Sequence, residues 1–133
     1  MHENELRALI VDDSEMSRRI TARIIAKVFS YDEAENGLIA VQKYQEAIEQ
    51  GTPYDIVFMD IIMPEMDGKE AVRSIREYEA SSGIMRVPII MISASEMITE
   101  IEELVSGLLR KAVNKQTMDA MLQKLFDGKI APL

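Results

Sequence analysis

Five residues that could carry out chemistry lie where apolar runs of the sequence end. Asp12 and Asp13 follow LRALIV, Asp60 ends YDIVFMD, Ser93 ends VPIIMIS, and Lys111 ends GLLRK. Carboxylate oxygens are suitable ligands for Mg²⁺, and a carboxylate can also attack phosphorus to form an aspartyl phosphate. A serine hydroxyl and a lysine ammonium could hold phosphoryl oxygens. Brought together, the five residues would make a site for phosphoryl transfer.

Each residue taken alone also has an ordinary structural interpretation. An Asp pair before a helix is often a cap, and the later pair Asp67-Gly68 is typical of a turn. Ser93 could be a satisfied hydroxyl, and Lys111 could be a solvated surface residue. Asp60 is harder to explain this way, because the strand before it is apolar on both faces and a buried charge is costly unless it is paired.

Composition excludes several other kinds of site. The 133-residue chain has 15 Lys and Arg against 23 Asp and Glu, a net charge of −8, which argues against nucleic acid as a partner. It has no Cys, and its single His is His2, so thiolate sites, disulfides and a Ser-His-Asp triad are not expected. No apolar run approaches the length of a membrane span, and the first residues lack a signal-peptide pattern. We therefore expect a cytoplasmic protein without membrane insertion.

The elements that must position these residues alternate along the chain. Apolar runs predict five strands, at 6–11, 30–35, 54–60, 87–93 and 107–111. Apolar residues at helical spacing predict five helices, marked by Met16 to Val28, Leu38 to Ile48, Ala71 to Tyr78, Met97 to Val105 and Met118 to Phe126. This alternation is typical of an α/β fold with a parallel sheet covered on both faces. In such a sheet the carboxyl ends of the strands lie at one edge, where ligands bind.

Several stretches of the sequence together resemble the receiver domain of two-component response regulators. The stretches are VDDSEMSR (11–18), AENG (34–37), DIVFMDIIMPEMDG (55–68), PIIMISA (88–94) and Lys111. The resemblance covers residues from about 6 to 126, and the MDG-containing loop is its most specific part. It implies a flavodoxin-like, doubly wound five-stranded parallel sheet of order 2-1-3-4-5 with five helices. We expect residues 1–133 to be a single receiver domain with no output domain in this chain.

The resemblance also implies roles for individual residues. Asp60 would be the phosphoacceptor, taking a phosphoryl group from a sensor histidine kinase or a phosphotransfer protein. Asp12, Asp13, Asp60 and the backbone carbonyl of Ile62 would hold Mg²⁺. Ser93 would be the switch hydroxyl, Lys111 would pair with the phosphoryl group, and the backbone of Ala94 would contact it.

Two departures from the family pattern concern the residues around Lys111. The family's lysine is usually followed by a proline joined through a cis bond, and this chain has Ala112 instead. A cis bond before a residue other than proline costs about 2.5–4 kcal/mol, so we predict a trans Lys111–Ala112 bond. The family usually has an aromatic switch residue three positions before the lysine, and this chain has Leu108 there. The stretch from Ser93 to Lys111 is also shorter than is usual in the family. The fourth helix and fifth strand are therefore where we expect this chain to differ from its family.

A third departure concerns the lifetime of the phosphorylated state. Ile62, two residues after Asp60, has no polar group to orient an attacking water molecule. We therefore predict slow auto-dephosphorylation and a long-lived phosphoryl-aspartate.

Two other functions are compatible with parts of the pattern. A degenerate receiver would bind partners without phosphorylation, and the Leu108 and Ala112 departures favour it. A haloacid-dehalogenase-like phosphatase also uses an Asp nucleophile with Mg²⁺, but it needs a second Asp where Ile62 stands. For the receiver, signalling would occur by contact with a downstream protein, and a homodimer is a further option.

Overall fold

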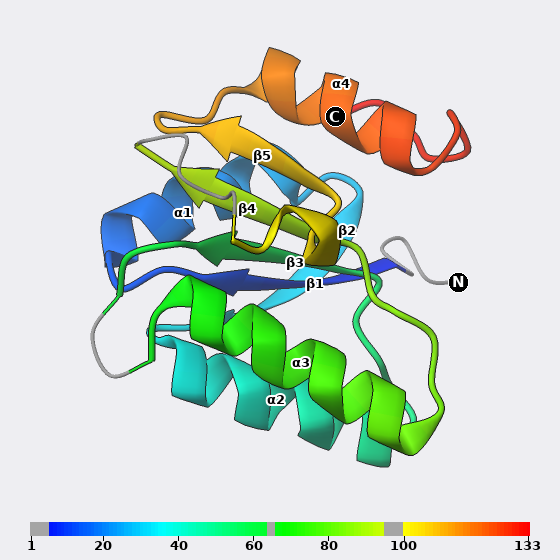
Figure 1. Cartoon of the computed structure of the whole chain (residues 1–133). Coiled ribbons are helices and arrows are strands. Elements are labelled where there is room, and N and C mark those ends of the chain that lie inside the picture. The colour runs from blue at the N-terminus through cyan, green and yellow to red at the C-terminus, as the bar shows by residue number, and fades with distance from the viewer. Residues whose placement is uncertain (1–5, 64–65, 95–99) are drawn as a thin grey trace.

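The computed structural model describes residues 6–63, 66–94 and 100–133, which form a parallel sheet between two layers of helices (Figure 1). The strands are β1 (Leu6–Val11), β2 (Phe29–Ala34), β3 (Ile56–Asp60), β4 (Ile89–Ser93) and β5 (Gly107–Arg110). The helices are α1 (Glu15–Ile25), α2 (Gly37–Glu49), α3 (Gly68–Ser82) and α4 (Lys115–Leu125), and Glu102–Leu104 forms a single 3₁₀ turn, η1.

The sheet has the order β2-β1-β3-β4-β5, and all its neighbouring strands are parallel. The predicted flavodoxin-like fold and its strand order are therefore confirmed. All five strands lie within one to two residues of their predicted bounds. Parallel pairing places the carboxyl ends of β1, β3, β4 and β5 at the same edge of the sheet.

The prediction of five helices is wrong, because the described residues hold four α-helices. The fourth helix was expected around Met97 to Val105, of which 95–99 lie outside the described residues. The described remainder makes only the 3₁₀ turn η1, and Val105 is already extended. Ile101, which directly precedes η1, is 1% exposed, so its side chain reaches the core although the described residues that follow it form no α-helix.

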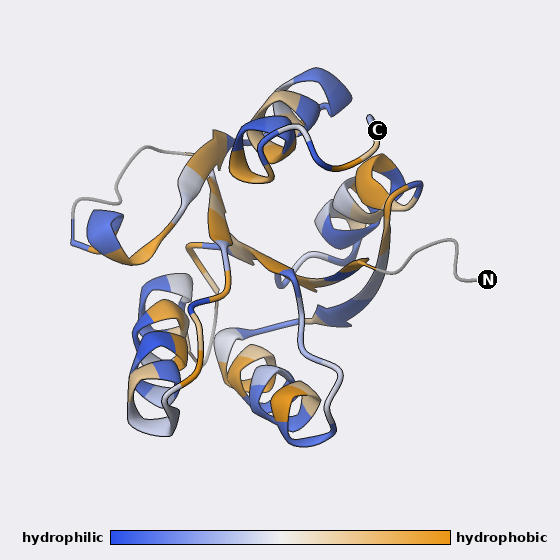
Figure 2. Ribbon diagram, turned by 90° about the vertical axis from the view of Figure 1, so that its right-hand side faces the viewer, coloured by the Kyte–Doolittle hydropathy of each residue, from blue (hydrophilic) through white to orange (hydrophobic). Residues whose placement is uncertain are grey.

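Alternating residues of the strands supply two separate hydrophobic cores. On β3, Val57 and Met59 face α2 and α3, whereas Ile56 and Phe58 face α1 and α4. Figure 2 shows apolar residues along the sheet and on the helix faces turned toward it. Because both sides of the central strands are buried, only their ends can present a polar group.

Each helix begins after a residue whose side chain caps it. Ser14, Asn36, Asp67 and Asn114 accept hydrogen bonds from the backbone N–H three residues later. Such caps satisfy one of the free N–H groups at a helix start. The Asp67-Gly68 pair, interpreted above as a turn, therefore begins α3.

The connection from β4 to β5 is fastened to α3 and to the loop after it by three basic side chains. Arg76 Nε donates to the Leu104 carbonyl at 2.8 Å, and Arg86 donates to the Glu103 carbonyl at 3.1 Å. Lys69 and Glu100 form an ion pair at 2.6 Å. These three contacts hold residues 100–104 against the α2–α3 side of the molecule.

None of the helices in the described part of the chain is both long and apolar enough to cross a membrane.

Candidate functional site

Three carboxylates meet where β1 and β3 end. Asp12 and Asp13 directly follow β1, and Asp60 is the last residue of β3. One carboxylate oxygen from each lies within 4.8 Å of the others. Asp12 and Asp60 are 5% and 6% exposed, whereas Asp13 is exposed. The site thus has two buried carboxylates and a third that faces solvent.

Lys111, which follows β5, reaches the same place. Its Nζ lies 3.1 Å from Asp12 Oδ2 and 3.4 Å from Asp60 Oδ2. Its backbone N–H donates to the Ser93 carbonyl at 2.8 Å, which continues the pairing of β5 with β4. The topology therefore brings together four of the five residues singled out in the sequence, with side-chain contacts between Lys111 and both buried carboxylates.

The peptide bond after Lys111 differs from our prediction. The Lys111–Ala112 bond is cis, so the expectation of a trans bond is wrong. That expectation considered only the local preference of the peptide bond. In the fold, Lys111 is held on one side by the Ser93 carbonyl and on the other by two carboxylates, and these contacts were not part of the local argument.

The electrostatics of the site favour binding of a cation. Burial, then the charge of Asp12, raises the pKa of Asp60 to about 6, although the Lys111 ammonium acts in the opposite direction. Burial alone would lower the pKa of Lys111, but its hydrogen bond to Asp12 and the charges of both buried carboxylates outweigh burial and raise it. One ammonium therefore does not balance the negative charge at this edge.

Ser93 ends β4 beside the acidic cluster. Asp60 pairs in register with Ile92, so Ser93 lies one position further along the neighbouring strand, and it is 2% exposed. Ala94 follows it and is exposed. Both residues lie at the expected edge, and their roles stay predictions.

The loop after Asp60 contains two apolar residues that face inward and one that faces outward. Ile61 and Met63 are each 7% exposed, whereas Ile62 is 76% exposed. Ile62 therefore presents an apolar side chain to solvent two residues from Asp60. The side chain offers no hydrogen-bonding group.

Gly68 allows the start of α3 to approach Asp60, which sequence reasoning did not foresee. A Cβ atom at this position would lie 2.2 Å from the Asp60 carbonyl oxygen and 2.9 Å from Ile61 Cα. The Gly68 N–H also donates to the Ile61 carbonyl at 2.8 Å. The Asp-Gly pair is visible in the sequence, but this close approach depends on the tertiary structure.

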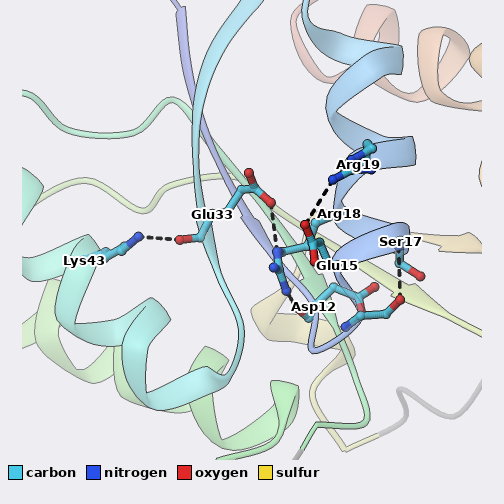
Figure 3. A network of polar contacts seen from close by, with 8 residues as sticks. Asp12, Glu15, Ser17, Arg18, Arg19, Glu33 and Lys43 are labelled. Atoms are coloured by element: carbon cyan, nitrogen blue, oxygen red, sulfur yellow. Dashed lines mark hydrogen bonds and ion pairs between the residues drawn. The ribbon is translucent and has the colours of Figure 1, made fainter.

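Asp12 is held by contacts from three directions, of which Figure 3 shows the one with Arg18. Its backbone N–H donates to the Ala34 carbonyl at 3.1 Å, and its Oδ1 accepts from the Ser14 N–H at 2.9 Å. Its carbonyl accepts from Arg18 Nη1 at 2.7 Å, and Arg18 Nε donates to Glu33 Oε1 at 2.8 Å. Arg18 was also missed, since nothing in the sequence pairs it with Asp12 beyond its place on the following helix.

The residues present fit a magnesium ion. The available ligands are carboxylate oxygens gathered within 4.8 Å. Mg²⁺ prefers oxygen ligands, keeps several water molecules and commonly uses one or two carboxylates together with phosphate. The exposed side of the cluster, at Asp13, would leave room for those waters.

The known proteins that this chain resembles include members of two-component systems. A family model described as response regulator receiver domain matches residues 8–127. The two-component response regulator ORR41 of Oryza sativa subsp. japonica is 33% identical over 127 residues, which cover 90% of this chain and 93% of that protein. The histidine kinase CKI1 of Arabidopsis thaliana is 39% identical over 100 residues, which cover 68% of this chain and 9% of the kinase.

A solved structure extends the likeness to the fold. The receiver domain of that kinase, complexed with Mg²⁺ and BeF₃⁻, is 30% identical and superposes with a TM-score of 0.79. The match covers 94% of this chain and 92% of that one.

Proposed function

The chain belongs to the family of response regulator receiver domains, and we propose that it accepts a phosphoryl group on Asp60. The observation that carries the proposal is the convergence of Asp12, Asp13, Asp60 and Lys111 at one edge of the sheet. Asp60 is the carboxylate that ends the central strand β3, and Lys111 touches it directly.

In the proposed reaction a carboxylate oxygen of Asp60 forms a bond to phosphorus. The donor is a phosphohistidine on a histidine kinase or a phosphotransfer protein. The P–N bond breaks, and its electron pair stays with the imidazole nitrogen. The similarity to a kinase receiver domain and to a response regulator supports this class of donor. The phosphorylated chain would then act by contact with a downstream protein.

The other residues of the site would bind and orient the phosphoryl group. Lys111 would move its contact from the Asp60 carboxylate to a phosphoryl oxygen, because the ammonium already lies 3.4 Å from Asp60 Oδ2. The Ser93 hydroxyl would donate to another oxygen, and the backbone N–H of Ala94 would help. Leu108 is partly buried against the core on the α2–α3 side and cannot act as an aromatic switch residue.

Asp12, Asp13 and Asp60, with the backbone carbonyl of Ile62, would hold Mg²⁺. When bound, this ion supplies positive charge that reduces the repulsion between the carboxylates and the incoming phosphoryl group. Asp13 would provide the exposed ligand and Asp12 the fixed one, because the backbone of Asp12 is held on both sides.

The test uses a small phosphodonor in place of a protein partner. The chain is incubated with Mg²⁺ and acetyl phosphate, and intact mass is compared for the parent, Asp60→Asn and Asp67→Asn. Asp67 caps α3, and Asn caps a helix as well as Asp does, so Asp67→Asn changes the same group in the same loop without affecting the cluster. We expect phosphorylation of the parent and of Asp67→Asn, and none of Asp60→Asn.

Phosphorylation that persists in Asp60→Asn would refute the assignment of Asp60. A parent that gains no phosphoryl group under these conditions would refute the phosphoacceptor function and favour binding of partners without phosphorylation.

A further inference from the structure

Arg18 makes the one side-chain contact to the Asp12 backbone carbonyl that the described residues show. It lies in the first turns of α1, and its side chain is only 14% exposed although the neighbouring Arg19 side chain is 64% exposed. Nη1 donates to the Asp12 carbonyl at 2.7 Å and Nε donates to Glu33 Oε1 at 2.8 Å, as Figure 3 shows. The planar guanidinium therefore spans from the end of β1 to β2.

The partner of Arg18 is itself held in place. Glu33 lies on β2, and its backbone carbonyl accepts a hydrogen bond from Lys43 Nζ on α2. Ala34, the next residue, accepts from the Asp12 N–H. The guanidinium thus connects Asp12 to a strand that is fixed independently of α1.

We infer that Arg18 is a positioning residue for the metal site, acting through the backbone of Asp12. This inference rests on the proposed function, because it treats Asp12 as a ligand of Mg²⁺. Outer contacts that orient a metal ligand commonly affect metal affinity by 10–100-fold. Arg18 would fix where the Asp12 carboxylate points by fixing the peptide group next to it.

Replacing Arg18 should affect Mg²⁺ affinity in opposite directions, depending on whether its charge or its contact with Asp12 matters more. Removing a positive charge near a cation site would by itself strengthen Mg²⁺ binding, because like charges repel. Losing the contact to Asp12 would weaken it, because the carboxylate would no longer be held. A fall in affinity therefore points to positioning and cannot come from the change of charge.

The adjacent Arg19 provides a matched control. It lies on the same helix and carries the same charge, but its side chain is 64% exposed and its one ion pair among the described residues is with Glu15 at 3.0 Å. Figure 3 draws the Arg19–Glu15 pair and the Arg18–Asp12 contact as separate dashed lines. Arg19→Met removes one positive charge from α1 without touching Asp12.

The experiment measures binding of Mg²⁺ alone, by titrating MgCl₂ and following amide chemical shifts of the folded chain. We expect Arg18→Met to weaken Mg²⁺ binding by about tenfold, and Arg19→Met to leave it unchanged or slightly stronger. Arg18→Lys should also lose most of the affinity, because a single ammonium does not reproduce the fork that serves two partners. Arg18→Lys keeps the test decisive if Arg18→Met does not fold.

Equal Mg²⁺ affinity in the parent and in the folded Arg18 variants would overturn the inference and leave the proposed function intact. The same holds if Arg19→Met weakens binding as much as Arg18→Met does. A parent that shows no saturable response to Mg²⁺ would overturn the proposed metal site and this inference together.

Discussion

Lys111 Nζ lies 3.4 Å from Asp60 Oδ2, and yet the pKa of Asp60 is raised to about 6. Burial and the neighbouring charge of Asp12 outweigh the attraction of the ammonium. In the absence of a divalent cation, ionisation of Asp60 is therefore less favourable in the folded chain than in the unfolded chain. Additional positive charge, such as a bound cation, would therefore stabilise the ionised carboxylates of the site.

This pKa predicts how stability depends on pH without metal. The folded chain binds a proton at Asp60 more tightly than the unfolded chain does, so the free energy of unfolding should fall as pH rises from about 4 to about 6. The full cost, about 3 kcal/mol for two pKa units, should be present above that window. Denaturant unfolding in EDTA should show it in the parent and not in Asp60→Asn.

The clearest measure is the difference in the free energy of unfolding between the parent and Asp60→Asn at each pH. Asp60→Asn should be more stable than the parent at pH 7, and the two should converge toward pH 4. Asp67→Asn should follow the parent throughout. A difference that stays constant over this range would contradict the raised pKa.

Replacing Ile62 should change how fast the phosphoryl group is lost. Ile62 is 76% exposed, so Ile62→Asn can add an amide beside Asp60 without disturbing the core. One hydrogen bond of about 1 kcal/mol to the attacking water corresponds to roughly fivefold faster hydrolysis. The measurement is the decay of phosphorylated chain after removal of acetyl phosphate. Ile62→Val should decay like the parent, and an Asn variant that decays no faster would count against the prediction.

Gly68→Ala should destabilise the chain more than another Gly→Ala change does. At Gly68 the new methyl group would meet backbone atoms, with the Asp60 carbonyl oxygen at 2.2 Å. At Gly107 it would meet, among the described residues, the end of the flexible Met121 side chain and no backbone atoms. We expect a loss of about 1–3 kcal/mol for Gly68→Ala and a smaller loss for Gly107→Ala, as measured by denaturant unfolding. The reverse ranking would show that α3 can move away from Asp60 at little cost.

Arg76 should matter far more to stability than Arg73 on the same helix. Arg76 is 10% exposed and its Nη1 lies 2.8 Å from Glu79 Oε1, whose side chain is 1% exposed. Removing one member of a buried ion pair costs about 3–5 kcal/mol, because the other charge is left without its partner. Arg73 is exposed, and a surface change of this kind stays within about 0.5 kcal/mol. Thermal or denaturant unfolding of Arg76→Met and Arg73→Met distinguishes the two, and similar losses would contradict the role of the buried pair.

The sequence was sufficient to predict the sheet and the acidic cluster for a physical reason. Strands such as VFMD and IIMIS are apolar on both faces, and only a central parallel strand buries both. Once the strands are parallel, the positions of Asp60 and Lys111 at one edge follow from topology. At these positions the apolar pattern of each strand and its place in the sheet predict the same structure.

The features that were missed or wrong depend on contacts between segments distant in the sequence. The Lys111–Ala112 bond was judged by local preference alone. The residues up to Val105 have helical spacing, but β5 begins at Gly107 and η1 is all the helix that the described residues there contain. The contact from Arg18 to Asp12 requires the position of β2, which supplies Glu33.

The fastening of residues 100–104 to α3 affects how freely this connection can change in evolution. Arg76 and Arg86 bind the carbonyls of Leu104 and Glu103, and every amino acid has a carbonyl group. Substitutions at 103 and 104 therefore preserve both anchors and the path of the chain. This surface lies beside the start of β5, at the edge of the sheet opposite to Asp60, and it can diversify in side chains between related proteins while its backbone stays in place.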